Sequence, residues 1–409
     1  MRISAHSTNS SNTLSPISIS LLMSLGPATA LGFARFSYAL LLPAMAKSLN
    51  LNYVEAGALN VTNAAGYLLG ALTVDRVSLQ YGHKRVFISS MALIVLFLSL
   101  VGVTQSYVTI LVLRAISGYF GALIFISGGA LLAHNLHKIG DGGKNTSLAI
   151  GLYYGGAGVG TAISGFGLPY LLKMVGDNNW AFGWYLLSSL ALVSLIAVVF
   201  ALKSLEDPQY LTVDHKRTTK STKVTHIWPS ILSYGLFGAG YISFMTFIVA
   251  FFRSEGKDGF FISFFYLILG SASFLSAFVW SRPLSRLSGG NGLAATYLVV
   301  AVGSILPIVF SGAIGSTVSG LLFGLGLMAS STALIKVSQR NLSASMITKA
   351  LGISTAAMAL GQIFGPLLTG TVSDRYGVAS GMLASTVVLV LATLTALFQS
   401  DIKTIESSP

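Results

Sequence analysis

Two arginines lie inside long apolar segments of this chain, where few other charges occur. Arg35 falls within GFARFSYALLLPAM (32–45), and Arg114 falls within LRAISGYFGA (113–122). In a membrane, such an arginine costs at least about 2.5 to 3.5 kcal/mol, so it normally faces a cavity or a partner and marks a functional site. A guanidinium binds carboxylate or phosphate bidentately. Both residues are therefore candidates for recognition of an anion.

The elements that must carry these arginines are predicted to be membrane-spanning helices. Hydrophobic residues make up 53% of the 409 residues and charged residues only 9%, whereas about a quarter of a soluble domain is charged. Uncharged segments long enough to cross a bilayer, roughly 17 to 25 residues, recur along the chain. They are apolar nearly all round, which favours helices over the alternating strands of a barrel. The expected fold class is all-α, with twelve segments at about 18–45, 55–74, 86–104, 107–133, 146–172, 181–202, 228–252, 259–280, 291–311, 314–335, 349–373 and 378–399.

The basic residues indicate how these segments are oriented. The chain has 24 Lys and Arg against 12 Asp and Glu, a net charge of +12. With twelve spans and both termini in the cytoplasm, seventeen of the 24 fall on the cytoplasmic side and five on the opposite side. Cytoplasmic loops hold the positive charge of membrane proteins, so this asymmetry explains the basicity. We therefore expect a lipid bilayer and no nucleic acid as partner.

The predicted segments form two sets of six. A polar linker at 203–227 separates an N-terminal bundle at 1–202 from a C-terminal bundle at 228–409. Because six is an even number, two copies of this unit would have the same orientation, related by an axis along the membrane normal. We expect two pseudo-symmetric six-helix bundles joined by a cytoplasmic linker.

Glycines in the fifth and eleventh segments repeat with one spacing, at an offset of 205 positions: Gly156, Gly160 and Gly165, and Gly361, Gly365 and Gly370. Small residues on one helix face let membrane helices approach closely, so we expect packing at these positions. The same smooth faces would also let one bundle rock against the other. A competing fold with two inverted five-helix repeats would give an offset nearer roughly 150 to 180 residues, which disagrees with these glycines.

Several motifs resemble those of the major facilitator superfamily. Between spans two and three, Gly70, Asp75, Arg76 and then residues 81–85 are similar to its loop motif, although Val77 to Tyr81 separate the Asp-Arg pair from Gly82. Arg114 with Gly118 and Gly121 resembles its fourth-span motif, and residues 361–377 are typical of its eleventh span. The resemblance covers essentially the whole chain.

The first span carries a more specific resemblance, to the YbfB/YjiJ group of that superfamily. It rests on Gly32, Phe33, Arg35, Phe36, Tyr38, Leu41, Leu42, Pro43 and Met45. The resemblance implies a monomeric transporter of the bacterial inner membrane, with both termini cytoplasmic. It also implies that spans one and four line a central cavity, which would place Arg35 and Arg114 near one pathway.

The sequence does not identify which group pairs with the charges of the two arginines. Arg35 lies roughly 13 Å and Arg114 roughly 10 Å from the same membrane face by helix rise. No Asp or Glu falls deep in any predicted span. An anionic substrate would supply the missing partner. Alternatively, carbonyls, Tyr38, Ser37 or water could satisfy Arg35, and Arg114 could brace the fourth span as a structural residue. Phe33 and Phe36 with Tyr38 are candidates to line the substrate site, or to pack.

The sequence lacks several motifs that catalysis, cofactor binding or ATP-driven transport would need. The chain has no Cys, and it lacks a phosphate-binding loop of the GxxxxGK[ST] type. We therefore expect no enzyme activity, no metal and no cofactor. The resemblance implies a proton gradient as the energy source. The candidates for coupling or gating are Glu55, Asp75 and Arg76, with Arg114 as a further coupling candidate.

These observations predict a secondary transporter that moves a small solute by alternating access between its two bundles. The sharper hypothesis is a proton-coupled carrier of an organic anion or amphipathic compound, with Arg35 as the anion contact. The alternatives are an efflux carrier for drugs or metabolites without anion preference and, with less support from the residues, a channel or membrane enzyme of another fold.

Overall fold

The computed structural model describes residues 15–139, 146–203, 205–207, 223–310, 312–342 and 344–401. Every regular element in these ranges is helical, as the apolar segments predict. Most of the predicted linker lies outside the described residues.

The first six spans comprise nine of these elements. Span one is built from α1 (Pro16–Met23), α2 (Leu25–Pro27), the π-helix η1 (Ala28–Phe36) and α3 (Tyr38–Leu49). The others are α4 (Tyr53–Tyr81), α5 (His83–Val103), α6 (Tyr107–Ile139), α7 (Thr146–Val175) and, after the short η2 (Asp177–Asn179), α8 (Ala181–Leu202). We call these helices the first half.

The remaining helices, which we call the second half, repeat this plan. After the short η3 (Val224–Ile227) come α9 (Trp228–Ser254), α10 (Gly259–Arg286), α11 (Asn291–Val309), α12 (Ala313–Leu327), α13 (Ala329–Asn341), α14 (Ala344–Tyr376) and α15 (Val378–Leu397). The tenth predicted segment corresponds to α12 and α13 together.

Ten helices in the described residues are long and apolar enough to cross a membrane. Two more, α4 with 29 residues and α7 with 30, are also long enough. Polar Asn60 and Asn63 in α4 and the many glycines of α7 lower their hydropathy. Most helices extend beyond the predicted segments, because the helical backbone continues into the polar zone at either membrane face.

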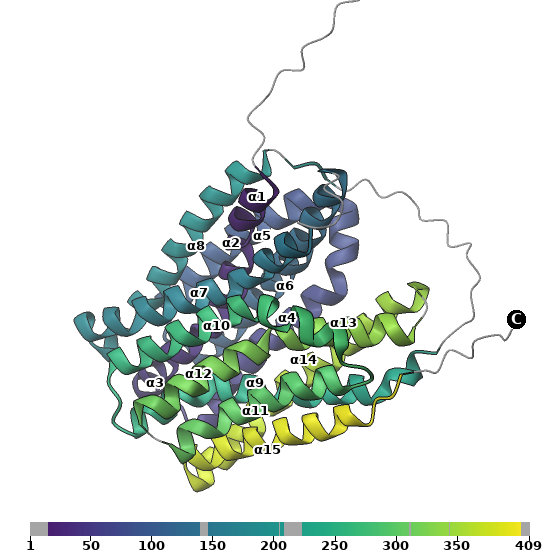
Figure 1. Ribbon diagram of the computed structural model, residues 1–409. Coiled ribbons are helices and arrows are strands. Elements are labelled where there is room, and N and C mark those ends of the chain that lie inside the picture. The colour runs from purple at the N-terminus through teal and green to yellow at the C-terminus, as the bar shows by residue number, and fades with distance from the viewer. Residues whose placement is uncertain are drawn as a thin grey trace, which may run out of the picture.

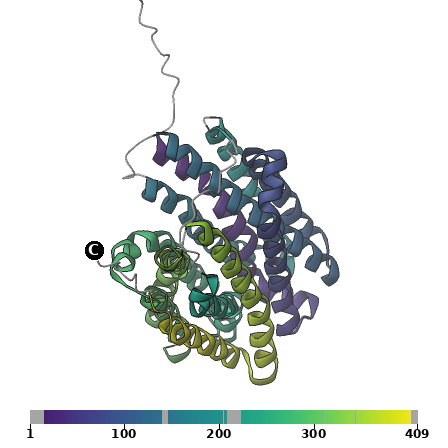
Figure 2. The ribbon, with the colours of Figure 1, turned by 90° about the vertical axis from the view of Figure 1, so that its right-hand side faces the viewer.

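The two halves occupy separate regions, the first purple to teal and the second green to yellow (Figure 2). Contacts between them are made mainly by α7 with α10 and by α4 with α14, that is, by spans five and eight and by spans two and eleven. Spans one and seven also meet, through α3 and α9. Adding six to each span number of the first half converts the pair five and eight into the pair eleven and two, and it maps span one onto span seven. A parallel repeat requires this relation, and an inverted five-helix arrangement would not produce it.

The repeated glycines contact equivalent partners in the two halves. A methyl group at Gly156 or Gly160 would clash with the backbone of span one at Ser24 and Ala28. A methyl group at Gly361 or Gly365 would clash with α9, the first helix of the second half. The third glycine of each set faces the opposite half, since Gly165 meets Tyr266 and Gly370 meets Tyr53. In each set, therefore, the first two glycines let their helix pack closely within its own half, and the third lets it pack closely against the other half.

A carboxylate joins the two halves at the end where α3 finishes, which we call the far end. There the Asp374 carboxylate accepts hydrogen bonds from the backbone N–H groups of Tyr53 at 2.8 Å and Val54 at 3.1 Å, the first residues of α4. Towards the opposite end, which carries Leu202 and Trp228 and is called the linker end, α1 and α13 are far apart (Figure 1). A methyl group at Gly352, in the linker-end part of α14, would have no neighbour within 4 Å.

Two glycines of α14 offer a matched test of this packing. Gly361→Ala should lower the melting temperature in detergent by several degrees, because its methyl group meets the Gly235 carbonyl. Gly352→Ala should leave that temperature unchanged or slightly raised, since alanine favours helix over glycine by about 1 kcal/mol. Unfolding followed by tryptophan fluorescence measures both. Equal melting temperatures for the two variants would contradict the close approach of α14 and α9.

Candidate functional site

Arg35 is buried where the two halves meet, with 4% of its surface exposed. Its Nη2 donates a hydrogen bond of 2.6 Å to Oε1 of Gln362 on α14, in the opposite half. Gln362 in turn donates from Nε2 to the hydroxyl of Tyr241 on α9, also at 2.6 Å. The guanidinium lies over the ring of Tyr67 on α4, 5.3 Å from its centroid. The Arg35 Nε is buried and has no hydrogen-bond partner.

Arg114 is fully buried and is held by groups of the first half. Its Nε donates to the carbonyl of Leu59 at 3.3 Å, and its Nη1 donates to the carbonyl of Ala34. The guanidinium carbon lies 4.8 Å from the ring centroid of Tyr38 and 5.4 Å from that of Trp184. Nη2 has no hydrogen-bond partner. Arg114 therefore fastens spans one, two, four and six together and retains one free donor.

The backbone of span one changes to a π-helix at the residues that approach these arginines. The π-helix runs over Ala28–Phe36, directly after Pro27. Its last turn is closed by the Ser37 N–H and the Gly32 carbonyl at 3.1 Å. Single π-turns are often found at functional sites. The bond from Arg114 to Ala34 enters this segment one residue before Arg35, so span one brings both arginines together.

The aromatic residues predicted to line the site have other contacts. Tyr38 donates from its hydroxyl to the Ala56 carbonyl at 2.7 Å and places its ring against Arg114. Phe33 and Phe36 are buried among core residues, with 2% and 5% of their surfaces exposed. None of these three has a described polar or ring contact with Arg35.

Sequence reasoning missed the neutral polar residues that surround Arg35. They are Tyr67, Tyr241 and Gln362, and beside them the Asn60 Nδ2 donates to Thr246 Oγ1 of α9 at 2.6 Å. Amide side chains are rare inside the apolar segments, so Asn60 and Gln362 were detectable as polar exceptions. The sequence did not show that Asn60 bonds Thr246 and Gln362 bonds Arg35 across the two halves.

The three other residues predicted for coupling or gating lie away from the arginines. Glu55 forms a capping box with Asn52 at the far-end start of α4, accepting from the Asn52 N–H at 2.9 Å. Asp75 and Arg76 are exposed in the linker-end part of α4. Among the described residues, no group of three or more metal-binding side chains occurs.

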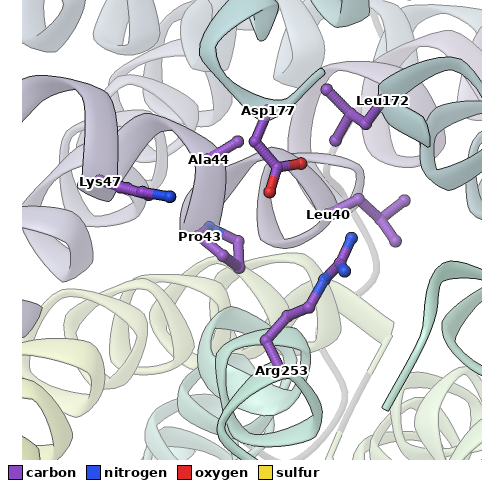
Figure 3. Close-up of a pocket in the computed structure, with 7 residues that line it drawn as sticks. All are labelled: Leu40, Pro43, Ala44, Lys47, Leu172, Asp177 and Arg253. Atoms are coloured by element: carbon purple, nitrogen blue, oxygen red, sulfur yellow. The ribbon is translucent and has the colours of Figure 1, made fainter. Parts of the chain in front are cut away.

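A small hollow of about 200 Å³ lies between the halves at the far end. Span one contributes Leu40, Pro43, Ala44 and Lys47, and the remaining lining residues are Leu172, Asp177 and Arg253. The Asp177 carboxylate and the Arg253 guanidinium both point into this space (Figure 3). This hollow is separate from the Arg35 site.

Comparison with known proteins gives the site a family context. Residues 27–397 match the family model described as "Uncharacterised MFS-type transporter YbfB". No curated protein matches the sequence.

Solved structures match over nearly the whole chain. A mutant of the nucleoside transporter NupG has a TM-score of 0.72 at 13% identity, covering 93% of this chain and 99% of its own. An inward-facing, unoccupied bacterial homologue of the human lysosomal transporter Spinster has a TM-score of 0.64 at 16% identity, covering 92% and 95%. At such identities the likeness concerns the fold.

Arg114→Lys should destabilise the folded protein, because an ammonium cannot reach both carbonyls and both rings at once. Hydrogen bonds to charged groups contribute about 1.5 to 3 kcal/mol each, so we expect a loss of about 2 kcal/mol or more. Thermal unfolding in detergent measures the change. The matched control is Arg286→Lys, at an exposed position of α10, which should have the same melting temperature as the wild type. An unchanged melting temperature for Arg114→Lys would contradict the bracing role.

Proposed function

Because the chain belongs to the YbfB family of major facilitator superfamily transporters, we propose that it carries a small organic anion across the bacterial cytoplasmic membrane by alternating access. It is a multi-pass membrane transporter and not an enzyme. The anion, the direction of access and the moving units are the parts that we propose.

The observation that supports an anionic substrate is the unsatisfied charge of Arg35. Its described partners are an amide oxygen and an aromatic ring, both neutral, and its Nε donor is free. Among the described hydrogen bonds of Arg35 and Arg114, none is made to a carboxylate. Because burial makes an uncompensated charge costly, a bound carboxylate or phosphate would be stabilised strongly here.

The surroundings of Arg35 favour an anion with an apolar or aromatic body. Tyr67 lies under the guanidinium, and the Tyr241 hydroxyl accepts a hydrogen bond from Gln362, the amide that Arg35 binds. Tyrosine rings offer a flat apolar face and a hydroxyl that bonds polar edges. This combination suits a carboxylate attached to a ring or short hydrocarbon better than a small inorganic ion.

The arrangement of the halves supports alternating access. On the far-end side of Arg35, the halves are tied together by Asp374 of α14, which binds the start of α4, and by the Asn60–Thr246 bond, while Gly352 on the other side has open space. We assign this state as closed at the far end and accessible from the linker end. We propose that residues 1–202 and 228–409 move as two units, with 203–227 connecting them.

The charge asymmetry supports the linker end as the cytoplasmic end. Exposed Arg76, Arg282 and Arg286 lie towards this end, and positive charge concentrates on the cytoplasmic side of membrane proteins. The far end would then face the periplasm. On this orientation the state described is inward-facing.

A proton gradient is the proposed energy source, on the resemblance to the superfamily. Glu55 is a weak candidate for the coupling group, since its carboxylate already caps α4. Uptake measured with and without an imposed pH gradient tests the coupling, and equal rates would remove protons from the proposal.

An efflux carrier without anion preference is the second candidate. It is favoured by the neutral partner of Arg35, because Gln362 already accepts the hydrogen bond of one guanidinium nitrogen, Nη2. Thermal-shift screening against metabolites and drugs at two pH values separates the candidates, since only an anion carrier should prefer carboxylates over neutral analogues.

Arg35→Lys and Arg35→Gln should each reduce transport of the identified anion at least about tenfold, since neither side chain offers the bidentate fork. Counterflow in proteoliposomes measures the rate and distinguishes a carrier from a channel. The control Arg282→Gln lies at an exposed position of α10 and should transport normally. Full-rate transport by folded Arg35 variants would contradict the proposal.

The orientation is tested with single cysteines, because the natural chain contains none. Glu255→Cys, in the exposed far-end loop after α9, should react with a membrane-impermeant maleimide in intact cells. Gln80→Cys, exposed near the end of α4, should react only after lysis. The reverse pattern would overturn the assignment of the linker end to the cytoplasm.

A further inference from the structure

We propose that Gln362 is a displaceable stand-in for the transported anion, so that substrate binding at Arg35 releases a buried latch between the two halves. This inference rests on the proposed function and assigns a gating role at the same site. The latch is the chain Arg35–Gln362–Tyr241, which ties span one to spans eleven and seven.

The orientation of the Gln362 amide is fixed by its two neighbours. Arg35 can only donate hydrogen bonds, so it must face the amide oxygen, and the amide nitrogen then donates to the Tyr241 hydroxyl. The oxygen lies 2.6 Å from Nη2, the position that one oxygen of a bound carboxylate would take. Gln362 is itself buried, with 5% of its surface exposed. A neutral oxygen thus fills part of the anion position when no substrate is present.

The latch is only partly formed, which leaves substrate an advantage. Gln362 offers one acceptor oxygen to Arg35, and the Arg35 Nε stays buried without a partner. A carboxylate offers two oxygens that match the guanidinium fork and a full negative charge, whereas the amide offers one oxygen and no charge. An anion can therefore replace the amide oxygen, whereas a neutral analogue gains little by doing so.

Displacement has a consequence for the halves because Arg35 and Gln362 lie on opposite sides of the interface. Breaking their bond removes one of the two described hydrogen bonds that join a side chain of one half to a side chain of the other, the second being Asn60 to Thr246. The anion would then remain with Arg35 while span eleven is free to move. Binding of the anion to Arg35 and release of the Arg35–Gln362 bond therefore occur in the same step.

Two variants change the latch in opposite directions. Gln362→Met keeps the length of the side chain but removes the acceptor, so benzoate should bind about tenfold more tightly. Gln362→Glu places a carboxylate permanently beside Arg35, so benzoate binding should fall at least tenfold. Calorimetric titration with benzoate, with phosphate and with neutral benzamide as probes measures these affinities.

Thr246→Val is the matched control, because it breaks the other buried bond between the halves without touching Arg35. Its affinity for benzoate should stay within about twofold of the wild type. An effect equal to that of Gln362→Met would show that loosening the interface alone raises affinity and would overturn displacement. An Arg35-dependent affinity that is unchanged in both Gln362 variants would overturn it as well.

A second measurement needs no ligand. Spin labels at Gln80→Cys and Gln339→Cys, exposed near the linker end of each half, report the opening of that end. Without ligand, Gln362→Met should increase the short-distance population and Gln362→Glu should decrease it. If no probe binds the wild type, the proposed anion transport fails. These distances alone then decide the latch, and identical distributions for the two variants overturn it.

Discussion

The structure depends on a buried positive charge that has no fixed negative partner. Arg35 and Arg114 both lie in the interior, and their described hydrogen-bond acceptors are carbonyl and amide oxygens. The two residues resolve this constraint differently. Arg114 is enclosed by span-one and span-two carbonyls and two aromatic rings of its own half. Both keep one unpaired donor, but Arg35 has a single described hydrogen bond, to the neutral oxygen of Gln362 across the interface, so we propose that its charge is the one available to a ligand.

The close packing of the helices follows from the absence of a hydrophobic drive between helices in a bilayer. Glycines provide the close backbone approach, and the pattern is the same in spans five and eleven. The first two glycines of each set contact the first helix of their own half, and the third contacts the other half. Smooth surfaces of this kind allow two rigid groups of helices to change their relative tilt without repacking large side chains.

The contacts between the halves differ in strength along the membrane normal. At the far end the Asp374 carboxylate binds two backbone N–H groups at the positive start of α4, which is favourable for an anion. In the middle, the ties are single hydrogen bonds between side chains. The linker-end part of α14 has open space at Gly352. Contacts between the halves are therefore present at the far end and in the middle, whereas the linker-end part of α14 has open space. This distribution corresponds to a state closed at the far end, in which the central bonds help to hold the halves together.

The sequence alone predicts the all-helical membrane class, the approximate positions of the spans and the family, because segment length, apolar composition and motif spacing are local properties. It also selected Arg35 and Arg114, since charge inside an apolar run is visible without a structure. It did not reveal the π-helix of span one or the bond from Arg35 to Gln362, 327 positions away. Nor did it show that Tyr38, on the same span as Arg35, places its ring against Arg114. Those features were decided by tertiary structure, because a side chain's partner depends on which helices face each other and at what depth.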